Sequence, residues 1–524
     1  MNGKCIGGSH GLMVALLCLA FLLQCLFASR EKSPVFDEPV HIVAGASYIA
    51  TGKISANLQH PPLVKELAGL SLALAGIRWK GSDEQRGGWE WDAASPFLTD
   101  AGVARALFWA RLPMLLLAPL LGLVIYWWGR EVAGPRAGLG ALFLFAADPT
   151  MVAHSWLVTT DTAAASFSLL FLIALYRYLQ RPGRSRLLWA GAALGLALGV
   201  KFSTVFLFPI AAVLLVVGAP QPAGIRARLA FAARSLAGMG LVAVVAVQVL
   251  YFSWRGPAIY LRGLHRVNGD HARGFLFYFA GQLKTRFASY FAAAWLLKEP
   301  LATIGLTLGG AVLAVRSRDI ARLAKFFLLL PPAVFFLACT LWADDIGIRY
   351  EIPAMVFGYL AGGIALAALW KGRAFHRAVA LAACAWVVLA AAGIYPDHLS
   401  YFNEAACLPG HADRIGLDGG SRCGPEWLAD SNVDWGQSLP QLKAWLDEHA
   451  AGRAVKLMYF GFLPPAAYGI RFEPAALAPA PARGLYAISA HGLAYGLSDP
   501  RLDWLREEPA AVVGHAYYLF DIDY

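Results

Sequence analysis

Long apolar runs, separated by short polar segments, recur along most of the chain. A helix needs about 20 apolar residues to cross a bilayer, and eleven of these runs approach that length. The pattern therefore predicts a mainly α-helical polytopic membrane protein with about 11 transmembrane helices. The predicted spans are residues 11–29, 106–128, 137–154, 160–176, 187–201, 202–218, 235–252, 300–315, 326–342, 350–370 and 378–395.

The first apolar run, residues 11–29, allows two interpretations: a cleaved signal peptide or an uncleaved first span. We favour the span, because the run is long for the core of a signal peptide. The interval 187–218 is less regular, and we interpret it as two short spans that meet near Lys201.

The positions of arginine and lysine orient these spans. Loops between alternate spans are short and basic, as at residues 177–186, whereas residues 155–160 and 344–347 contain neither Arg nor Lys. Because short basic loops stay in the cytoplasm, we expect the N-terminus inside and the C-terminus outside.

Two of the predicted external loops are long, residues 30–105 and 253–299. The first contains apolar helical patterns at residues 39–50 and 63–77. Both patterns are too short to span a bilayer, so we expect two juxtamembrane helices along its outer surface.

The continuous apolar runs stop at Pro396, where the pattern changes to that of a small external α/β domain. The sequence thus predicts a transmembrane domain of residues 1–395 and a C-terminal soluble domain of residues 396–524. The predicted elements of the second domain are a helix at 439–449 and strands at 454–460, 485–489 and 516–522.

Composition agrees with a membrane protein, since 58% of the residues are hydrophobic and only 15% are charged. The formal net charge of +10 arises largely from the basic loops assigned to the cytoplasm, so we expect no nucleic acid partner. Cys407 and Cys423 are the two cysteines in the predicted external domain, where they enclose a short, Gly-rich loop. A disulfide between them and two free thiols are both compatible with the sequence.

Three carboxylates stand where the predicted spans meet the external face. Asp37 and Glu38 come shortly after the first span, and Asp161 begins the fourth. Charged groups at a membrane boundary are costly unless they are solvated or paired, which makes these acids candidates for function. The structural alternative is that Asp37 and Asp161 each cap a helix.

Cations are predicted on the same face. His60 and Lys65 belong to the first external loop, Lys298 to the second, and Arg349 stands at the outer end of the tenth span. Such groups can bind a lipid phosphate. The alternatives are a helix start with a snorkelling lysine, contact with anionic headgroups, and a simple interfacial anchor.

The segment from Asp430 to Gln437 contains side chains suited to a sugar or a peptide. Asp434 can accept hydrogen bonds and Trp435 can stack on a ring. The alternative is a capped turn that leads into the helix after Leu439.

In order along the chain, these motifs resemble the GT-C glycosyltransferases that use polyprenyl-phosphate sugars, the superfamily of the protein O-mannosyltransferases and the aminoarabinose transferases. Two departures are Glu299, where the family pattern has threonine, and His60, where the aminoarabinose transferases have lysine. The matching segments are residues 36–41, 60–65, 160–162, 268–271, 297–300, 348–353, 399–404 and 430–437.

The resemblance implies an inverting transfer of a sugar from a polyprenyl-phosphate carrier to an acceptor hydroxyl. Asp37 would be the general base, and Asp161 would orient the site or bind a divalent metal ion. Lys65, Arg349 and Lys298 would stabilise the departing phosphate. Glu38 is the second candidate for the base, and His60, Asp434 and Trp435 are substrate-binding candidates.

The resemblance also implies a bacterial inner-membrane enzyme whose active site and C-terminal domain face the periplasm. The acceptor would be a protein, a lipid or a glycan. A transporter or lipid flippase is the alternative class, although no repeat of the chain is visible. A membrane scaffold that presents the C-terminal domain is a third.

Overall fold

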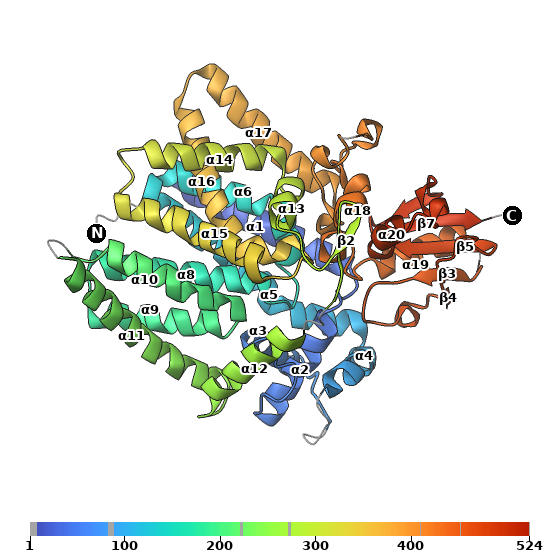
Figure 1. Ribbon diagram of the computed structural model, residues 1–524, viewed down its shortest axis with the longest axis horizontal. Coiled ribbons are helices and arrows are strands. Elements are labelled where there is room, and N and C mark those ends of the chain that lie inside the picture. The colour runs from blue at the N-terminus through green and yellow to red at the C-terminus, as the bar shows by residue number, and fades with distance from the viewer. Residues whose placement is uncertain are drawn as a thin grey trace.

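We describe the protein from a computed structural model, which covers residues 8–81, 88–220, 224–270, 274–408, 410–450 and 452–522. One residue of the sequence motifs, His271, lies outside these ranges. Within them the protein is mostly helical, and a small sheet region follows the helices near the C-terminus (Figure 1).

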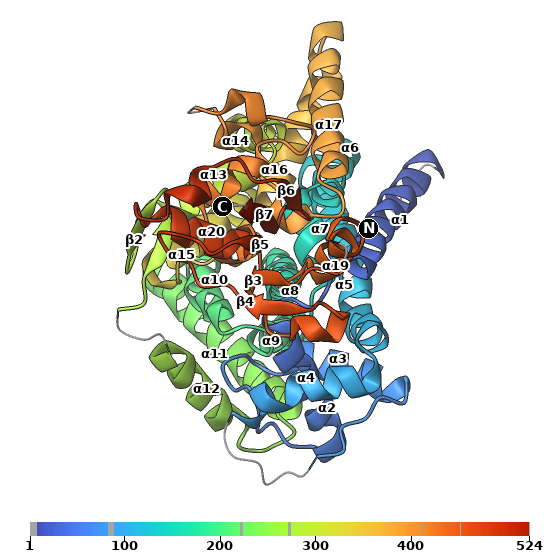
Figure 2. The ribbon, with the colours of Figure 1, turned by 90° about the vertical axis from the view of Figure 1, so that its right-hand side faces the viewer.

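The helices of the first three quarters of the chain form an elongated bundle, and the C-terminal sheet covers one end of it (Figures 1 and 2). These helices are α1 (Gly8–Arg30), α2 (Glu38–Thr51), α3 (Leu63–Leu74), α4 (Trp89–Ala101), α5 (Val103–Ala133), α6 (Pro135–Ala146), α7 (Pro149–His154), α8 (Asp161–Gln180), α9 (Arg184–Leu198), α10 (Leu207–Val217), α11 (Ile225–Leu250), α12 (Gly256–Asp270), α13 (Tyr290–Lys298), α14 (Leu301–Arg316), α15 (Arg322–Trp342), α16 (Ile352–Lys371) and α17 (Ala374–Gly393).

Every predicted span coincides with helix, but the helices differ in length. Seven described helical segments are long and apolar enough to cross a membrane, and an eighth candidate is the pair α13 and α14, which is bent by 114°. The remaining predicted spans correspond to shorter helices: α6 with α7, α9, and α10 with the 3-10 turn before it. The number of eleven spans therefore stays a prediction.

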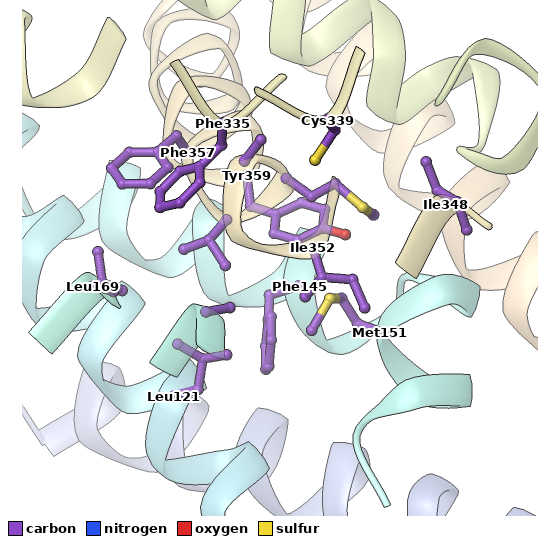
Figure 3. Packing of buried hydrophobic residues seen from close by; sticks show 14 of the residues in the cluster. Leu121, Phe145, Met151, Leu169, Phe335, Cys339, Ile348, Ile352, Phe357 and Tyr359 are labelled. Atoms are coloured by element: carbon purple, nitrogen blue, oxygen red, sulfur yellow. The ribbon is translucent and has the colours of Figure 1, made fainter. Parts of the chain in front are cut away.

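Close contacts between backbones hold the bundle together. A Cβ atom on Gly310 of α14 would lie 1.8 Å from the carbonyl oxygen of Ala361 in α16, and one on Gly363 would lie 2.2 Å from that of Ala137 in α6. Glycine at these positions lets three helices pack closely where side chains would keep them apart. Around this contact Leu121, Phe145 and Phe357 belong to one continuous apolar core (Figure 3).

The two helices predicted in the first long loop are present as α2 and α3. They pack closely, since a Cβ on Gly45 of α2 would lie 2.0 Å from the carbonyl oxygen of Lys65 in α3. Their position along the membrane surface stays a prediction.

The C-terminal region contains a five-stranded mixed sheet in the order β4-β3-β5-β7-β6. Strand β3 pairs parallel with β4 and β5, while β7 pairs antiparallel with β5 and β6. The predicted fold class is confirmed, although the boundary at residue 396 stays a prediction. The elements are α18 (Gly424–Trp427), α19 (Leu439–His449), β3 (Val455–Met458), β4 (Phe472–Pro474), β5 (Gly484–Ser489), α20 (Ala490–Leu497), β6 (Ala511–Val513) and β7 (Tyr517–Ile522), and a separate hairpin is formed by β1 (Phe277–Phe279) and β2 (Gln282–Lys284).

Cys407 and Cys423 form a disulfide, as one of the two interpretations of the sequence predicted. Both residues are buried, at 1% and 0% exposure. The bond closes the loop that leads from the bundle towards the sheet.

Candidate functional site

Three charged residues predicted from different parts of the sequence meet at the end of the bundle that carries the sheet. Arg349 Nη1 lies 3.2 Å from Asp37 Oδ2 and 3.8 Å from Asp161 Oδ2. Asp37 stands immediately before α2, Asp161 is the first residue of α8, and Arg349 lies in a 3-10 turn, Ile348–Glu351, that leads into α16. One guanidinium group thus links two acids that are far apart in sequence.

The two acids differ in exposure. The Asp37 side chain is 23% exposed, whereas that of Asp161 is 1% exposed. Neither side chain makes a helix-capping hydrogen bond, since α2 begins without one and α8 begins after Thr160. The capping alternative therefore does not describe the contacts of either residue.

Lys201 is a member of this cluster that the sequence interpretation missed. Its Nζ donates to Asp161 Oδ1 at 2.6 Å and lies 4.3 Å from the ring centre of Tyr350. The available signal was a single lysine between two apolar runs, because a buried ammonium group needs a partner.

Glu38 has a different environment from its neighbour Asp37. Its carboxylate accepts hydrogen bonds from Arg111 Nη2 at 2.6 Å and Arg111 Nε at 2.9 Å. It also accepts from the backbone N–H groups of Val35 and Val158. This buried carboxylate accepts four hydrogen bonds and thereby joins the segment before α2 to α5 and to the segment before α8.

Lys65 also makes contacts that fix the backbone. Its Nζ donates to the carbonyl oxygens of Asn57 and His60 at 2.6 and 2.8 Å and to Asn57 Oδ1 at 3.2 Å. Burial lowers the pKa of Lys65 to about 7. All three donor positions of the ammonium group are therefore used by the loop that precedes α3, and the lysine does not snorkel.

His60 lies beside a second histidine. The ring centres of His60 and His41 are 5.0 Å apart in an edge-to-face arrangement. Burial, and the nearby positive charge, lower the pKa of His60 well below its ordinary value, so the ring is neutral.

Lys298 connects the second loop to the C-terminal region. Its Nζ donates to the carbonyl oxygens of Asn432 at 2.6 Å and Leu399 at 2.7 Å, and lies 4.4 Å from the ring centre of Phe402. These contacts place Lys298 as a link between α13 and two later segments.

The segment Asp430–Gln437 folds over the charged cluster. The Arg349 guanidinium lies 4.1 Å from the ring centre of Trp435, and the Trp435 carbonyl accepts a hydrogen bond from the N–H of Phe36. Ser431 Oγ donates to the carbonyl of Ile346 at 2.7 Å. The segment therefore contacts both sides of the site, next to Asp37 and next to Arg349.

Two acids of this segment are buried. Asp434 Oδ1 accepts the N–H of Gly436, and burial raises the pKa of Asp434 to about 7. Asp430, which the sequence interpretation did not single out, has a left-handed φ of 57°. Burial raises its pKa to about 6, while Arg349 nearby opposes that rise. An aspartate with left-handed backbone beside Arg349 is a further candidate of the site.

The comparisons with known proteins concern the fold of the chain. Residues 103–251 match the sequence profile of the family described as dolichyl-phosphate-mannose-protein mannosyltransferase. The structure resembles that of ArnT from Cupriavidus metallidurans bound to undecaprenyl phosphate, with 14% identity, a TM-score of 0.50, and coverage of 93% of this chain and 94% of that one. The chain has the GT-C fold. The predicted GT-C fold is confirmed.

A second GT-C structure that resembles the chain is the archaeal oligosaccharyltransferase AglB from Archaeoglobus fulgidus, solved with an inhibitory peptide and a dolichol-phosphate. The identity is 13% and the TM-score 0.50; 73% of this chain is covered, but only 55% of AglB. No curated protein gives a significant sequence match.

Glu299, which stands where the family pattern has threonine, contacts a second acid in the structure. The Glu299 carboxyl group lies against Asp148, and both residues are buried. The Glu299 carbonyl accepts a hydrogen bond from Asn403 Nδ2 at 2.7 Å. A threonine has no carboxyl group and is too short to make this contact. Glu299 therefore forms a local pair with Asp148.

The two clustered acids, Asp37 and Asp161, do not fit a divalent metal ion in this arrangement. Asp161 is paired with Lys201, and Asp37 is paired with Arg349. The described residues contain no group of three or more His, Cys, Asp or Glu side chains placed to hold a metal. We therefore derive no step through a metal ion.

Proposed function

We propose that this protein is a membrane glycosyltransferase that transfers a sugar from a polyprenyl-phosphate carrier to an acceptor hydroxyl, with inversion at the anomeric carbon. The observation that carries the proposal is the Asp37–Arg349–Asp161–Lys201 cluster in a GT-C fold. It combines an accessible carboxylate with cations at the end of the bundle. The fold favours a transferase over a transporter or a scaffold.

Asp37 is the general base of this reaction, because it is the more exposed of the two clustered acids. Its carboxylate takes the proton of the acceptor hydroxyl as that oxygen attacks the anomeric carbon. The bond from that carbon to the phosphate oxygen breaks, and its electron pair leaves with the polyprenyl phosphate. A single displacement of this kind inverts the anomeric centre.

Arg349 binds the phosphate of the donor and stabilises the negative charge that develops on it. Its fixed, planar guanidinium suits a phosphate group, and the Trp435 ring holds it from one side. Lys201 keeps the buried Asp161 ionised, and Asp161 in turn helps to orient Arg349. When the phosphate takes over Arg349, Asp37 is released to act as a base.

An apolar pocket near Arg349 suits the lipid part of the donor. It encloses about 450 Å³ between α13, α14, α15 and α16, and its lining includes Trp295, Phe336, Met355 and Phe357. Glu351, two residues after Arg349, also lines it. A prenyl chain in this pocket would bring its phosphate to the 3-10 turn that carries the arginine.

The remaining predicted residues maintain the shape of the site and do not take part in the chemical step. Glu38, Lys65 and Lys298 hold the backbone around the site through the bonds described above. His60, Asp434 and Trp435 shape the surroundings of the donor and the acceptor. We further propose a bacterial inner-membrane location with this end of the bundle in the periplasm, which would make undecaprenyl phosphate the carrier.

The proposal is tested by replacing Asp37 with asparagine in a strain that lacks the chromosomal gene. We expect loss of a glycan modification from the cell envelope, by at least about 100-fold, at unchanged protein level, because the base is removed while the size is kept. Mass spectrometry of envelope glycoconjugates measures it. Asp100→Asn, at an exposed position of α4, is the matched control and should behave as wild type. Activity of Asp37→Asn within tenfold of wild type would refute the assignment of the base.

A further inference from the structure

Four aromatic side chains meet beside Asp37, and we call Phe36, Trp91, Phe460 and Phe462 the aromatic cluster. The ring centre of Phe36 lies 5.8 Å from Phe460, 6.0 Å from Phe462 and 6.1 Å from Trp91. Trp91 and Phe462 are 5.6 Å apart. The rings come from the segment before α2, from α4 and from the loop after β3, which the two ribbon views show side by side (Figures 1 and 2).

The cluster is not buried like an ordinary core. Trp91 is 36% exposed, and the other three side chains are half-buried. Phe36 directly precedes Asp37, the most exposed acid of the charged cluster. A partly open patch of large aromatic rings next to a reactive carboxylate is the kind of surface that binds a ligand.

The cluster is also held rigidly. The N–H of Phe36 donates to the carbonyl of Trp435 at 2.8 Å. Phe460 stacks on His491 with ring centres 3.7 Å apart and planes inclined by 8°. Fixed aromatic rings bind a partner at low entropic cost.

Polar groups stand at the edge of these rings. Nδ1 of His491 accepts the N–H of Asp430 at 3.1 Å. Because burial lowers the pKa of His491 to about 4, its ring is neutral and carries its proton on Nε2. Asp92 is exposed and follows Trp91 in the first turn of α4. Donors and acceptors therefore lie beside apolar ring faces.

A saccharide ring has the matching chemistry, since its C–H face is apolar and its edge carries hydroxyl groups. An acyl chain would not use the polar edge, and an apolar pocket for a chain already exists between α13 and α16. A peptide that bound by strand pairing would use a sheet edge, and neither edge strand, β4 or β6, contributes a ring to the cluster.

We propose that the aromatic cluster binds a saccharide ring of the acceptor and so presents one of its hydroxyl groups to Asp37. The proposal rests on the function proposed above, and it narrows the acceptor from protein, lipid or glycan to a molecule that carries a sugar at the end to be modified.

Saturation-transfer NMR of the full chain in lipid nanodiscs tests the binding without any donor. Maltotetraose and chitotetraose are the probes, and a serine-containing octapeptide is the comparison. We expect binding of at least one saccharide, about tenfold weaker in Trp91→Leu and Phe462→Leu, because leucine keeps an apolar side chain but removes the aromatic face. Trp91→Phe should keep most of the affinity. Trp254→Leu, at a 76% exposed tryptophan near the end of α11, is the matched control and should bind as wild type.

Thermal unfolding of each variant separates binding from folding. Binding of neither saccharide would overturn the proposal, as would equal losses in Trp91→Phe and Trp91→Leu. Binding of the peptide that disappears in Trp91→Leu would assign the cluster to a protein acceptor instead. Asp37→Asn should bind the saccharide within about twofold of wild type, since asparagine still forms hydrogen bonds. If glycan transfer proves independent of Asp37 while saccharide binding persists, the proposed base fails and the binding site stands.

Discussion

At the scale of single residues, Asp161 and Lys201 form a buried ion pair beside Arg349. Asp161 is 1% exposed and has one close partner, the Lys201 ammonium at 2.6 Å, with Arg349 at 3.8 Å. Its second oxygen, Oδ2, has no hydrogen-bond partner within the described part of the chain. Breaking a buried pair costs more than removing it, because one charge is left uncompensated.

We therefore predict that Lys201→Met destabilises the protein by roughly 3 kcal/mol and abolishes transfer. Adding Asp161→Asn should restore much of the stability but none of the activity, since Arg349 would then have lost one of its two acidic partners. Thermal unfolding in nanodiscs measures the stability, and the amount of envelope glycan measures the transfer. A double variant no more stable than Lys201→Met alone would contradict the pairing.

At the scale of elements, the segment Asp430–Gln437 packs against a charged cluster whose members Asp37, Asp161, Lys201 and Arg349 come from the helical part of the chain. Ser431 and Asn432 bond to the residues just before Arg349, with Ile348 N–H donating to Asn432 Oδ1 at 3.0 Å. Trp435 lies against the guanidinium itself. The C-terminal region therefore holds Arg349, the arginine that we propose binds the donor phosphate.

Trp435→Ala should accordingly weaken transfer about tenfold or more, because the guanidinium loses a stacking partner whose contribution is about 1–2 kcal/mol. Trp504→Ala is the control, since Trp504 is similarly buried, at 5% exposure, but lies in a 3-10 turn after α20. Glycan analysis and unfolding curves together give the activity per folded molecule of each variant, which separates a loss of activity from a loss of folded protein. Equal activity per folded molecule in both variants would make Trp435 a structural residue only.

At the scale of the whole molecule, one polar network ties the C-terminal sheet to the bundle. His515 Nδ1 lies 2.8 Å from Asp397 Oδ2, and its Nε2 lies 3.0 Å from Asp418 Oδ2. Lys32, just after α1, pairs with Asp397 and donates to Gln441 at 2.6 Å. Asp397 therefore links Lys32, from the segment after α1, to His515, from the segment before β7.

This network predicts a dependence of stability on pH. Despite burial, the two acids raise the pKa of His515 from 6.5 to about 9. Because this pKa is raised on folding, its contribution of about 3 kcal/mol is complete below pH 6.5 and is lost as the pH rises through about 9. The melting temperature should fall over that interval in wild type and much less in His515→Gln. The melting temperature of His449→Gln, at an exposed histidine of α19, should fall as that of wild type does.

The sequence by itself determined the helical character, the order of the apolar runs and the change of pattern near Pro396. Those features depend on local hydrophobic periodicity, which one segment reveals without its neighbours. The predicted helix at 439–449 coincides with α19, and the predicted strands at 485–489 and 516–522 lie within one residue of β5 and β7. The sequence motifs also identified Asp37, Asp161 and Arg349, each as a separate candidate.

Only the tertiary structure decided which of those candidates act together. Glu38 and Asp37 are adjacent in sequence but have different partners. Glu38 pairs with Arg111 of α5, whereas Asp37 pairs with Arg349 of the distant 3-10 turn. Lys65 and Lys201 are both isolated lysines, but one bonds to its own loop and the other to Asp161. The reason is physical: a buried charge takes its role from the partner that compensates it, and the fold brings that partner from elsewhere in the chain.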